Sequence, residues 1–363
     1  MPCFRPLRTL ICLALIPWLT ACADARYYLQ SVGGHFQMLQ AARPVDQWLE
    51  DAQVAPALKQ RLLLAQRIRQ FAVTELQLPD NASYHRYADV QRKAVVWNVV
   101  AAPEFSLTLK TWCFPVAGCV GYRGYFNEAE AREQAQALSA QGFEVSVYGV
   151  PAYSTLGWLN WLGGDPLLNT FIHYPEGELA RMIFHELAHQ VLYVQDDTLF
   201  NESFATAVER LGGERWLRQH GSPEAKKEYL ALDGRRQQFR ALLRTTRSRL
   251  ADIYKENRPL AQVLPAQSAM KNIAMQDFRN NYAQLKSSWG GYSGYDAWVA
   301  GANNAAFGAQ AAYDEWVTAF EVLFEQQGQN WAQFYDAVRR LSQLSAPDRH
   351  RTLNQLKTEQ PRG

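Results

Sequence analysis

The sequence of 363 residues has little cysteine, little excess of either charge, and no long hydrophobic run. Its formal net charge is +2, and two of the basic residues, Arg5 and Arg8, lie in an N-terminal segment that we expect to be removed. The mature chain is then nearly neutral and has no basic stripe to neutralise phosphates, so we expect no nucleic-acid partner. With 48% hydrophobic and 20% charged residues, the chain can form a large core and shows no compositional mark of disorder.

The apolar run near the N-terminus, from Leu10 to Leu19, is too short to span a bilayer and contains Pro17. Arg5 and Arg8 precede it and small residues follow it, which is the pattern of an export signal. We therefore predict a signal peptide over residues 1–21.

Leu19-Thr20-Ala21-Cys22 ends this segment and resembles the lipobox of bacterial lipoproteins. The resemblance implies that Cys22 is acylated and becomes the first residue of the mature chain, which needs no transmembrane helix as an anchor. Because Ala23 rather than aspartate follows Cys22, it also implies the periplasmic side of the outer membrane. The alternative is an ordinary secretory signal with a coincidental cysteine.

Of the five cysteines, only Cys113 and Cys119 remain in the mature chain. Two cysteines in an oxidising compartment suggest one disulfide, and the intervening Pro115 and Gly118 allow a tight loop. Closing so small a ring would stabilise the fold by about 2.4 kcal/mol on chain-entropy grounds. Two free thiols in the core are the alternative.

The order of the predicted elements, strands first and then helices, indicates an α+β fold that is mostly helical, with a small antiparallel sheet. We expect an N-terminal helical section over residues 22–90, a core with the sheet over 91–217, and a C-terminal helical section over 218–363. The expected strands cover residues 94–100, 106–112 and 144–150. The main expected helices cover 127–141, 178–194, 202–217, 223–257, 266–286, 309–326 and 331–344.

The motif that carries chemistry is His185-Glu186-Leu187-Ala188-His189. Residues four apart on a helix project side by side, so His185 and His189 can reach one metal ion. Glu186 lies on the adjoining flank, where it can act on a water at the metal without ligating the metal. The alternative is a structural pair of histidines.

A catalytic zinc ion needs a third protein ligand and an open position. Glu202 follows after twelve residues that can close a helical hairpin, with Asn201 as the expected N-cap of the second helix. Asn201-Glu202-x-Phe204-Ala205 after the first motif resembles the gluzincin peptidases, including the thermolysin-like and membrane alanyl aminopeptidase groups. That resemblance implies that Glu202 is the third ligand of one zinc ion, although the spacing is shorter here. Other carboxylates could substitute for it, namely Glu209, Asp196 and Asp197.

A wider resemblance covers nearly the whole mature chain and is to a bacterial family named as aminopeptidases from its zinc motif. It is carried by Tyr27-Tyr28-Leu29-Gln30, Trp112-Cys113-Phe114-Pro115, Tyr153-Ser154-Thr155-Leu156-Gly157-Trp158 and Asn303-Asn304-Ala305. It implies a zinc-dependent hydrolase of peptide bonds, in which Glu186 takes a proton from the attacking water and passes it to the leaving amine. The Gly-x-Met-Glu-Asn signature of aminopeptidases is absent, so an endopeptidase or maturation protease stays an alternative. A non-catalytic zinc-binding lipoprotein is a second alternative, against which the intact Glu186 speaks.

The segment with Tyr153, Ser154 and Thr155 precedes the motif helix at the place where gluzincins have an edge strand that pairs with substrate. The resemblance therefore implies substrate binding by these residues, and simple packing of the aromatic side chains is the alternative. Gluzincins also place a tyrosine or histidine beside the oxyanion. Tyr292 is our candidate here, and further candidates are Tyr295, Tyr313, Asn303 and Asn304.

Overall fold

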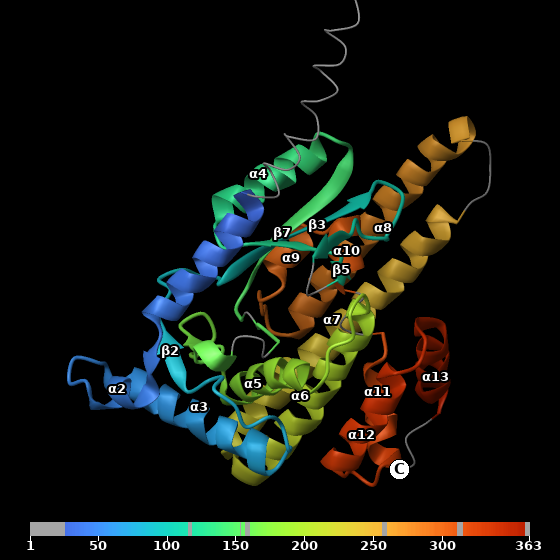
Figure 1. Ribbon diagram of the computed structural model, residues 1–363. Helices are drawn as coiled ribbons and strands as arrows, with labels where there is room; N and C mark the ends of the chain where they lie inside the picture. Colours follow the sequence, from blue (N-terminus) through green and yellow to red (C-terminus); the bar gives the residue numbers. More distant parts are fainter. Residues whose placement is uncertain are drawn as a thin grey trace, which may run out of the picture.

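The computed structural model describes residues 26–114, 118–152, 154–156, 160–255, 260–310 and 315–359 (Figure 1). The predicted signal, Cys22, Tyr153, Trp158 and Tyr313 lie outside these ranges. The described part is predominantly helical and carries small sheets of two or three strands, so the predicted α+β class is confirmed. None of its helices is both long and apolar enough to cross a membrane.

The main sheet has the strand order β6-β3-β7 and is antiparallel throughout. Its centre is β3 (Val96–Pro103), whose eight residues are mostly buried, between β6 (Arg123–Tyr125) and β7 (Phe143–Val150). Asn98 of β3 lies directly opposite Tyr148 of β7.

Alternate residues of β3 face two different helices, as strand geometry requires. On one face lies α4 (Glu128–Ser139), which begins at its predicted N-cap Asn127. On the other face lies α10 (Asn304–Gln310). The first face packs Val99 and Ala101 with Ala131 and Leu138, and the second packs Val100 and Ala102 with Ala305.

The predicted strand over residues 106–112 is wrong, because only Trp112 of that range lies in a strand. Leu107 and Leu109 give the range its alternation, but they pack on separate clusters beside α8 and α10 instead of joining the sheet. Strand β4 (Trp112–Phe114) instead pairs with β5 (Gly118–Val120) in a hairpin. Cys113 and Cys119 are joined across it, which confirms the predicted disulfide.

The largest core lies around α3 (Pro56–Thr74), α5 (Glu176–Val191) and α6 (Thr198–His220), which pack on one another. Residues 26–41 form a helix at the described start of the chain, and α2 (Val45–Glu50) follows. Beside them is a small sheet in the order β1-β2-β8, made by Arg43–Pro44, Arg86–Ala88 and Leu167–Leu168.

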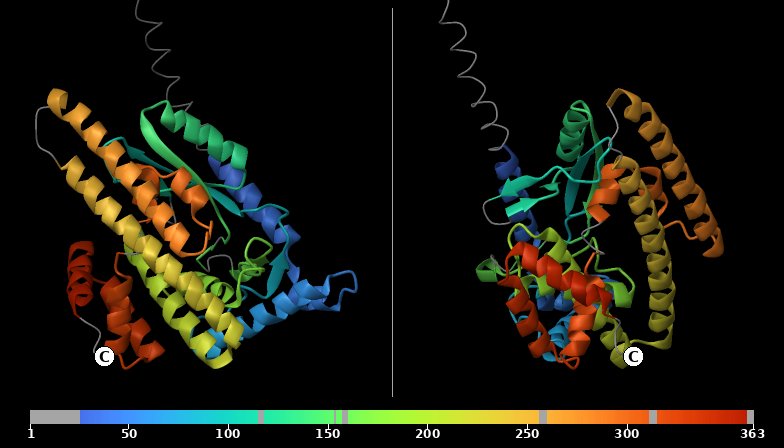
Figure 2. Two further views of the ribbon diagram at one scale, coloured as in Figure 1. Left: turned by 180° about the vertical axis from the view of Figure 1, so that it is seen from behind. Right: turned by 90° about the vertical axis from the view of Figure 1, so that its right-hand side faces the viewer.

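A second core lies between α7 (Pro223–Tyr254), α8 (Leu260–Ser288) and α9 (Asp296–Ala300). Figure 2 shows α7 and α8 as a long pair along one side of the molecule. The C-terminal helices are α11 (Val317–Gln326), α12 (Trp331–Ser342) and α13 (Ala346–Thr358), of which α11 packs on α6. One helix over 309–326 is a wrong prediction, because α10 ends at Gln310 and α11 begins only after Trp316.

Candidate metal centre

Helix α5 holds the first two donor side chains, and its rotation is fixed by its apolar side. Leu179, Ile183 and Leu187 are fully buried in the largest core. These residues are spaced by four, so the helix presents the opposite flank, with His185 and His189, away from that core. Burial of this apolar side therefore determines the direction in which the imidazoles of His185 and His189 project.

The turn after α5 differs from the prediction. Helix α6 begins at Thr198 with Asp197 as its N-cap, whose side chain accepts from the Phe200 amide at 3.1 Å. Asn201 is therefore not the N-cap, and the predicted start at this residue is wrong. Its amide instead clamps the loop, accepting from the Val194 N–H at 2.8 Å and donating to the Val194 carbonyl at 2.7 Å. This clamp fixes the first turns of α6 against the end of α5, and so positions Glu202.

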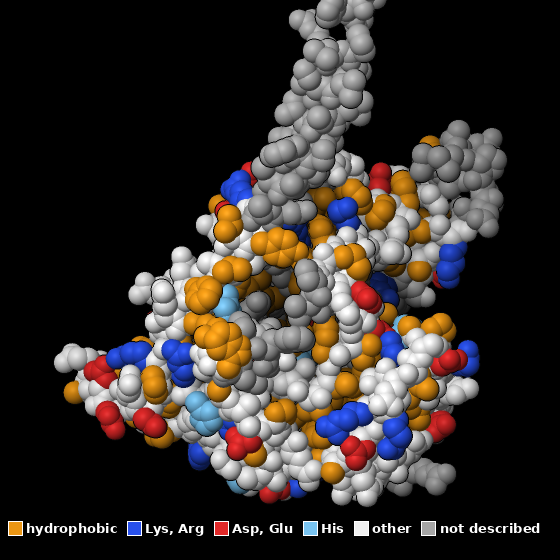
Figure 3. All heavy atoms as spheres, in the orientation of Figure 1, with side chains coloured by type: hydrophobic (Ala, Val, Ile, Leu, Met, Phe, Trp, Pro, Cys, Tyr) orange, Lys and Arg blue, Asp and Glu red, His pale blue; other side chains and the backbone are white. Residues whose placement is uncertain are grey.

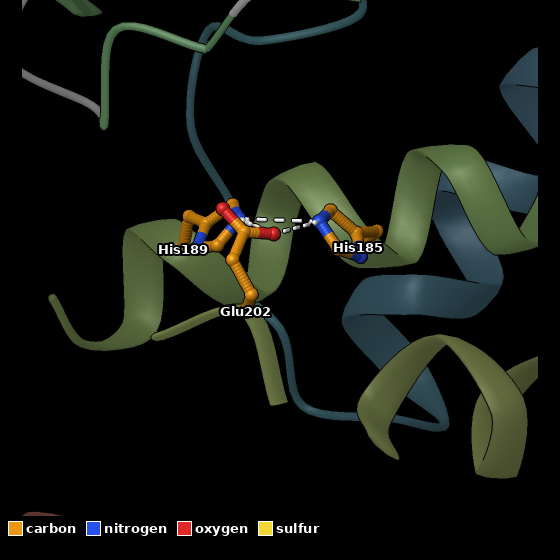
Figure 4. A group of neighbouring side chains, drawn as sticks. All are labelled: His185, His189 and Glu202. Atoms are coloured by element: carbon orange, nitrogen blue, oxygen red, sulfur yellow. Dashed lines mark hydrogen bonds and ion pairs between the residues drawn. The ribbon is translucent and has the colours of Figure 1, made fainter. Parts of the chain in front are cut away.

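The side chains of His185, His189 and Glu202 point toward one another from α5 and α6 (Figure 4). One donor atom from each lies within 4.8 Å of the other two. The Nε2 atoms of the histidines are 3.2 Å apart, and Oε2 of Glu202 lies 3.3 Å from Nε2 of His185 and 3.8 Å from Nε2 of His189. The structure therefore brings together the three predicted ligands.

These donors fit a zinc ion, although no ion is part of the structure. Two imidazole nitrogens and one carboxylate oxygen are a common donor set for catalytic zinc. Oε2 of Glu202 is buried and, among the described residues, makes no aligned hydrogen bond. A buried carboxylate oxygen without such a partner is costly unless a cation balances it. In the described part of the chain, this is the one cluster of three or more histidine, cysteine or acidic donors that could hold a metal.

Glu209 contacts His185 on the side of its ring opposite the converging donor atoms. Its Oε2 lies 2.9 Å from Nδ1 of His185, and its Oε1 accepts from Arg181. Arg181 is buried and also lies 3.4 Å from Asp233 of α7. Burial alone would raise the pKa of Glu209, but Arg181 and His185 lower it to about 2. Glu209 is therefore an ionised partner that orients His185, and not one of the three converging donors.

Protonation within the cluster leaves His189 and Glu202 in the forms that bind a metal, and gives His185 a proton that a metal ion would displace. Burial lowers the pKa of His189 to about 4, which keeps its imidazole neutral. Burial would raise the pKa of Glu202, but the neighbouring histidines lower it. For His185, burial is outweighed by Glu202 and Glu209, which raise its pKa well above the usual value. A cation in place of that proton would satisfy the same carboxylates.

Glu186 lies on the neighbouring flank of α5, in a buried acidic setting. Burial, together with the charges of Glu202 and Asp165, raises the pKa of the Glu186 carboxyl to about 7. The pKa of Tyr84 is raised by burial and by the charges of Glu186 and Asp165, so these three groups are neighbours. A carboxyl with a pKa near neutrality can both accept and release a proton.

Two tyrosines from the main sheet and its neighbouring loop lie close enough to Glu202 to feel its charge. Tyr148 on β7 and Tyr122 after β5 both carry pKa values raised first by burial and further by the charge of Glu202. The value for Tyr148 is about 12, so its hydroxyl stays protonated and can donate. His185 and Glu202 keep 12% and 15% of their side-chain surface accessible. In Figure 3 the surface is hollowed between the part that bears β7 and the part that bears α5.

The structure does not bring Tyr292 together with these groups. Its described ring contacts are with Trp289 and Tyr295, in the link between α8 and α9. Arg235 of α7 covers its face, 4.5 Å from the ring centroid.

Ser154 and Thr155 lie in a segment held by a residue that the sequence did not single out. The carboxylate of Asp165 is buried and accepts from the Thr155 amide at 3.0 and 3.2 Å. Its carboxylate also lies 3.5 Å from the side-chain amide of Gln190, the residue after His189. Asp165 thereby ties the segment to the C-terminal end of α5, next to the donors. Its isolated position in a loop carried no sequence signal beyond its lying between Gly164 and Pro166.

The fold and the donor cluster define an α+β, mostly helical protein with a candidate centre for one metal ion in its described part. Residues 26–353 match the model of the family described as "Putative aminopeptidase". Because the match covers most of the chain, the protein belongs to this family, and the predicted family is confirmed. Comparison with curated proteins and with solved structures gave no match. The family description indicates a peptidase, whose substrates are peptides.

Proposed function

We propose that the protein is a zinc-dependent peptidase, with His185, His189 and Glu202 as the ligands of one ion. The observation that carries this proposal is the convergence of two imidazole nitrogens and a buried carboxylate oxygen within 4.8 Å. A structural zinc site is usually closed by four protein ligands. Here three donors converge, and the carboxyl of Glu186 lies beside them.

In the proposed reaction, Glu186 is the general base and later the general acid. Zinc bound in the site would supply Lewis acidity toward water and toward the scissile carbonyl. Glu186 takes a proton from the attacking water and returns it to the leaving amine, so its carboxyl ends as it began. Its pKa of about 7 suits both transfers near neutral pH.

The phenol of Tyr148 is the group that would stabilise the negative charge developing on the scissile carbonyl oxygen. Tyr148 of β7 keeps its proton, is close enough to Glu202 to feel its charge, and is hydrogen-bonded to Asn98 of β3. A donor held in place before the reaction costs no reorganisation during it. Tyr292 stays the candidate that the sequence predicts.

The cleavage class we propose is removal of amino-terminal residues, supported by the family description. Location on the periplasmic side of the outer membrane, through Cys22, is a further part of the proposal and rests on the lipobox.

The test combines metal analysis with cleavage of a mixed peptide library, read by mass spectrometry. The purified chain should contain about one zinc per molecule and lose hydrolysis on chelation, and zinc should restore it. Loss of single residues from the amino end supports aminopeptidase action, whereas internal cuts would make it an endopeptidase. Glu186→Gln serves as the matched control for contaminating peptidases. Zinc without chelator-sensitive cleavage would mean a non-catalytic binding protein and would overturn the proposal.

A further inference from the structure

The helix over residues 26–41 is fixed on the sheet by its inner face. Tyr27 packs its ring on Phe114 and Tyr125, with centroids 5.6 and 5.5 Å away. Gln30 accepts from the Phe126 amide at 3.0 Å and donates to the Gly124 carbonyl at 3.3 Å.

Gly34 makes the closest approach of this helix to the sheet. A Cβ atom at this position would lie 2.2 Å from the Phe126 ring, so no larger residue fits. This contact, with those of Tyr27 and Gln30, places the opposite face of the helix outward in the structure.

That outer face is uncharged, and its first half, up to Phe36, exposes large apolar side chains, while Gln37 and Gln40 are exposed toward its end. Tyr28, Leu29, Val32 and Phe36 are 43%, 73%, 53% and 49% exposed, and the spacing of four between 28, 32 and 36 puts them on one side. From Tyr27 to Ala42 the sequence has no lysine, arginine, aspartate or glutamate. A surface helix in water normally carries charged residues on its outer face. A continuous apolar patch of this kind usually marks an interaction site.

The patch continues onto the 3₁₀ turn at Asn160–Leu162. Arg86 links this turn to the end of the helix, donating to the Leu162 carbonyl at 3.4 Å and to the Leu39 carbonyl at 3.1 Å. The turn carries Trp161, which is 78% exposed. Hydrophobic side chains gather over the helix and this turn in Figure 3.

We propose that this surface, formed by Tyr28, Leu29, Val32, Phe36 and Trp161, lies in the headgroup region of a phospholipid bilayer. This inference rests on the proposed acylation of Cys22: Tyr28 comes six residues later, so an acyl chain there would keep the helix within a short tether of the membrane. An uncharged apolar helix face with aromatic side chains matches the lipid interface, where tyrosine and tryptophan are enriched.

The test measures the depth of single labelled positions in the full chain, reconstituted in vesicles of phosphatidylethanolamine and phosphatidylglycerol. Leu29→Cys, Val32→Cys and Phe36→Cys each receive an environment-sensitive fluorophore, since the native Cys113 and Cys119 are paired. The matched control is Gln355→Cys on α13, an exposed position on the side of the molecule away from the helix (Figure 1).

Spin-labelled lipids should quench the three helix positions several-fold more strongly than position 355, and aqueous iodide should show the reverse order. Equal access of iodide to all four positions would overturn the proposal, as would a chain that stays in solution. A helix shielded from iodide but untouched by spin-labelled lipid would mean that a protein, either a second copy or a partner, covers this surface instead. A far-ultraviolet circular dichroism spectrum equal to that of the unlabelled chain shows that each labelled variant is folded.

Discussion

Oε2 of Glu209 lies 2.9 Å from Nδ1 of His185, on the edge of the imidazole away from the ligand atom Nε2. A carboxylate this close to Nδ1 favours the tautomer with its proton on Nδ1, which leaves the Nε2 lone pair for a metal. The contact separates the roles of two glutamates seven residues apart on α6. Glu202 faces the donors of α5, and Glu209 orients one of them while Arg181 neutralises it.

This division predicts different losses of zinc affinity in Glu202→Ala and Glu209→Ala. Removal of a ligand should weaken binding severely, whereas removal of an orienting carboxylate typically costs 10- to 100-fold. Competition with a zinc-sensitive chelator dye measures both. If Glu209→Ala strips the ion while Glu202→Ala keeps it, the assignment of the two glutamates is reversed.

Glu186→Gln should retain zinc and lose activity. The amide keeps the size of the side chain, but it cannot accept the proton of the attacking water. General-base catalysis typically contributes 10² to 10⁴ in rate, which is the expected decrease in kcat. Zinc content is measured on the same preparation, and hydrolysis near the wild-type rate with zinc bound would remove Glu186 from the mechanism.

Much of the candidate centre was predictable because the positions of its residues follow from patterns within single helices. The pair His185 and His189 follows from the helical repeat, and the apolar residues of α5 show which flank is buried. Asn127 predicts the start of α4 because its side chain caps the helix at the next turn. The pairing of Cys113 with Cys119 needs only that they are the two cysteines left after the signal.

The errors arose where distant contacts compete with local preference. Asp197 and Asn201 are both good N-cap residues, and the choice depends on Val194 and on Arg349 of α13, which binds Asp197 at 2.6 Å. Asp165 joins a loop to α5 across 25 residues, and Tyr148 comes from a strand 54 positions before Glu202. Contacts between residues far apart in the chain leave no repeating pattern in the sequence. The sequence alone therefore could not distinguish Asp165 and Tyr148 from other aspartates and tyrosines.

Replacement of tyrosines tests which phenol stabilises the oxyanion. Tyr148→Phe should lower kcat by about 10²- to 10³-fold, the usual loss for one oxyanion donor, with a smaller change in KM. Tyr122→Phe and Tyr292→Phe are the matched comparisons, the first beside Glu202 and the second in the aromatic link after α8. If kcat falls only in Tyr292→Phe, then Tyr292, as the sequence predicts, is the residue that stabilises the oxyanion.

Cys22 should be the acylated first residue of the mature protein. The short apolar run followed by Leu19-Thr20-Ala21-Cys22 predicts cleavage before this cysteine. Intact-mass analysis of protein extracted from membranes should show a chain that begins at Cys22 and carries added acyl mass. An unmodified Cys22, or a chain that begins elsewhere, contradicts the prediction.

Asp165 should make the folded state less stable as the pH rises. Burial raises the pKa of its carboxyl from 3.8 to about 6, although hydrogen bonds from Thr155 and Ser154 lower it in part. Between these values the folded chain binds more protons than the unfolded chain. The stabilisation by the protonated carboxyl is therefore complete below about pH 4 and is lost as the pH passes 6.

Asp165→Asn removes this titration and leaves the other groups in place. The free energy of unfolding of wild type, relative to Asp165→Asn, should fall between pH 4 and pH 7 by up to about 3 kcal/mol, since one pKa unit corresponds to about 1.4 kcal/mol. Urea unfolding at each pH measures both chains. If the free energies of unfolding of the two chains change in parallel between pH 4 and pH 7, the carboxyl of Asp165 titrates alike in the folded and unfolded chains. The segment with Thr155 would then be held by something other than a buried carboxylate.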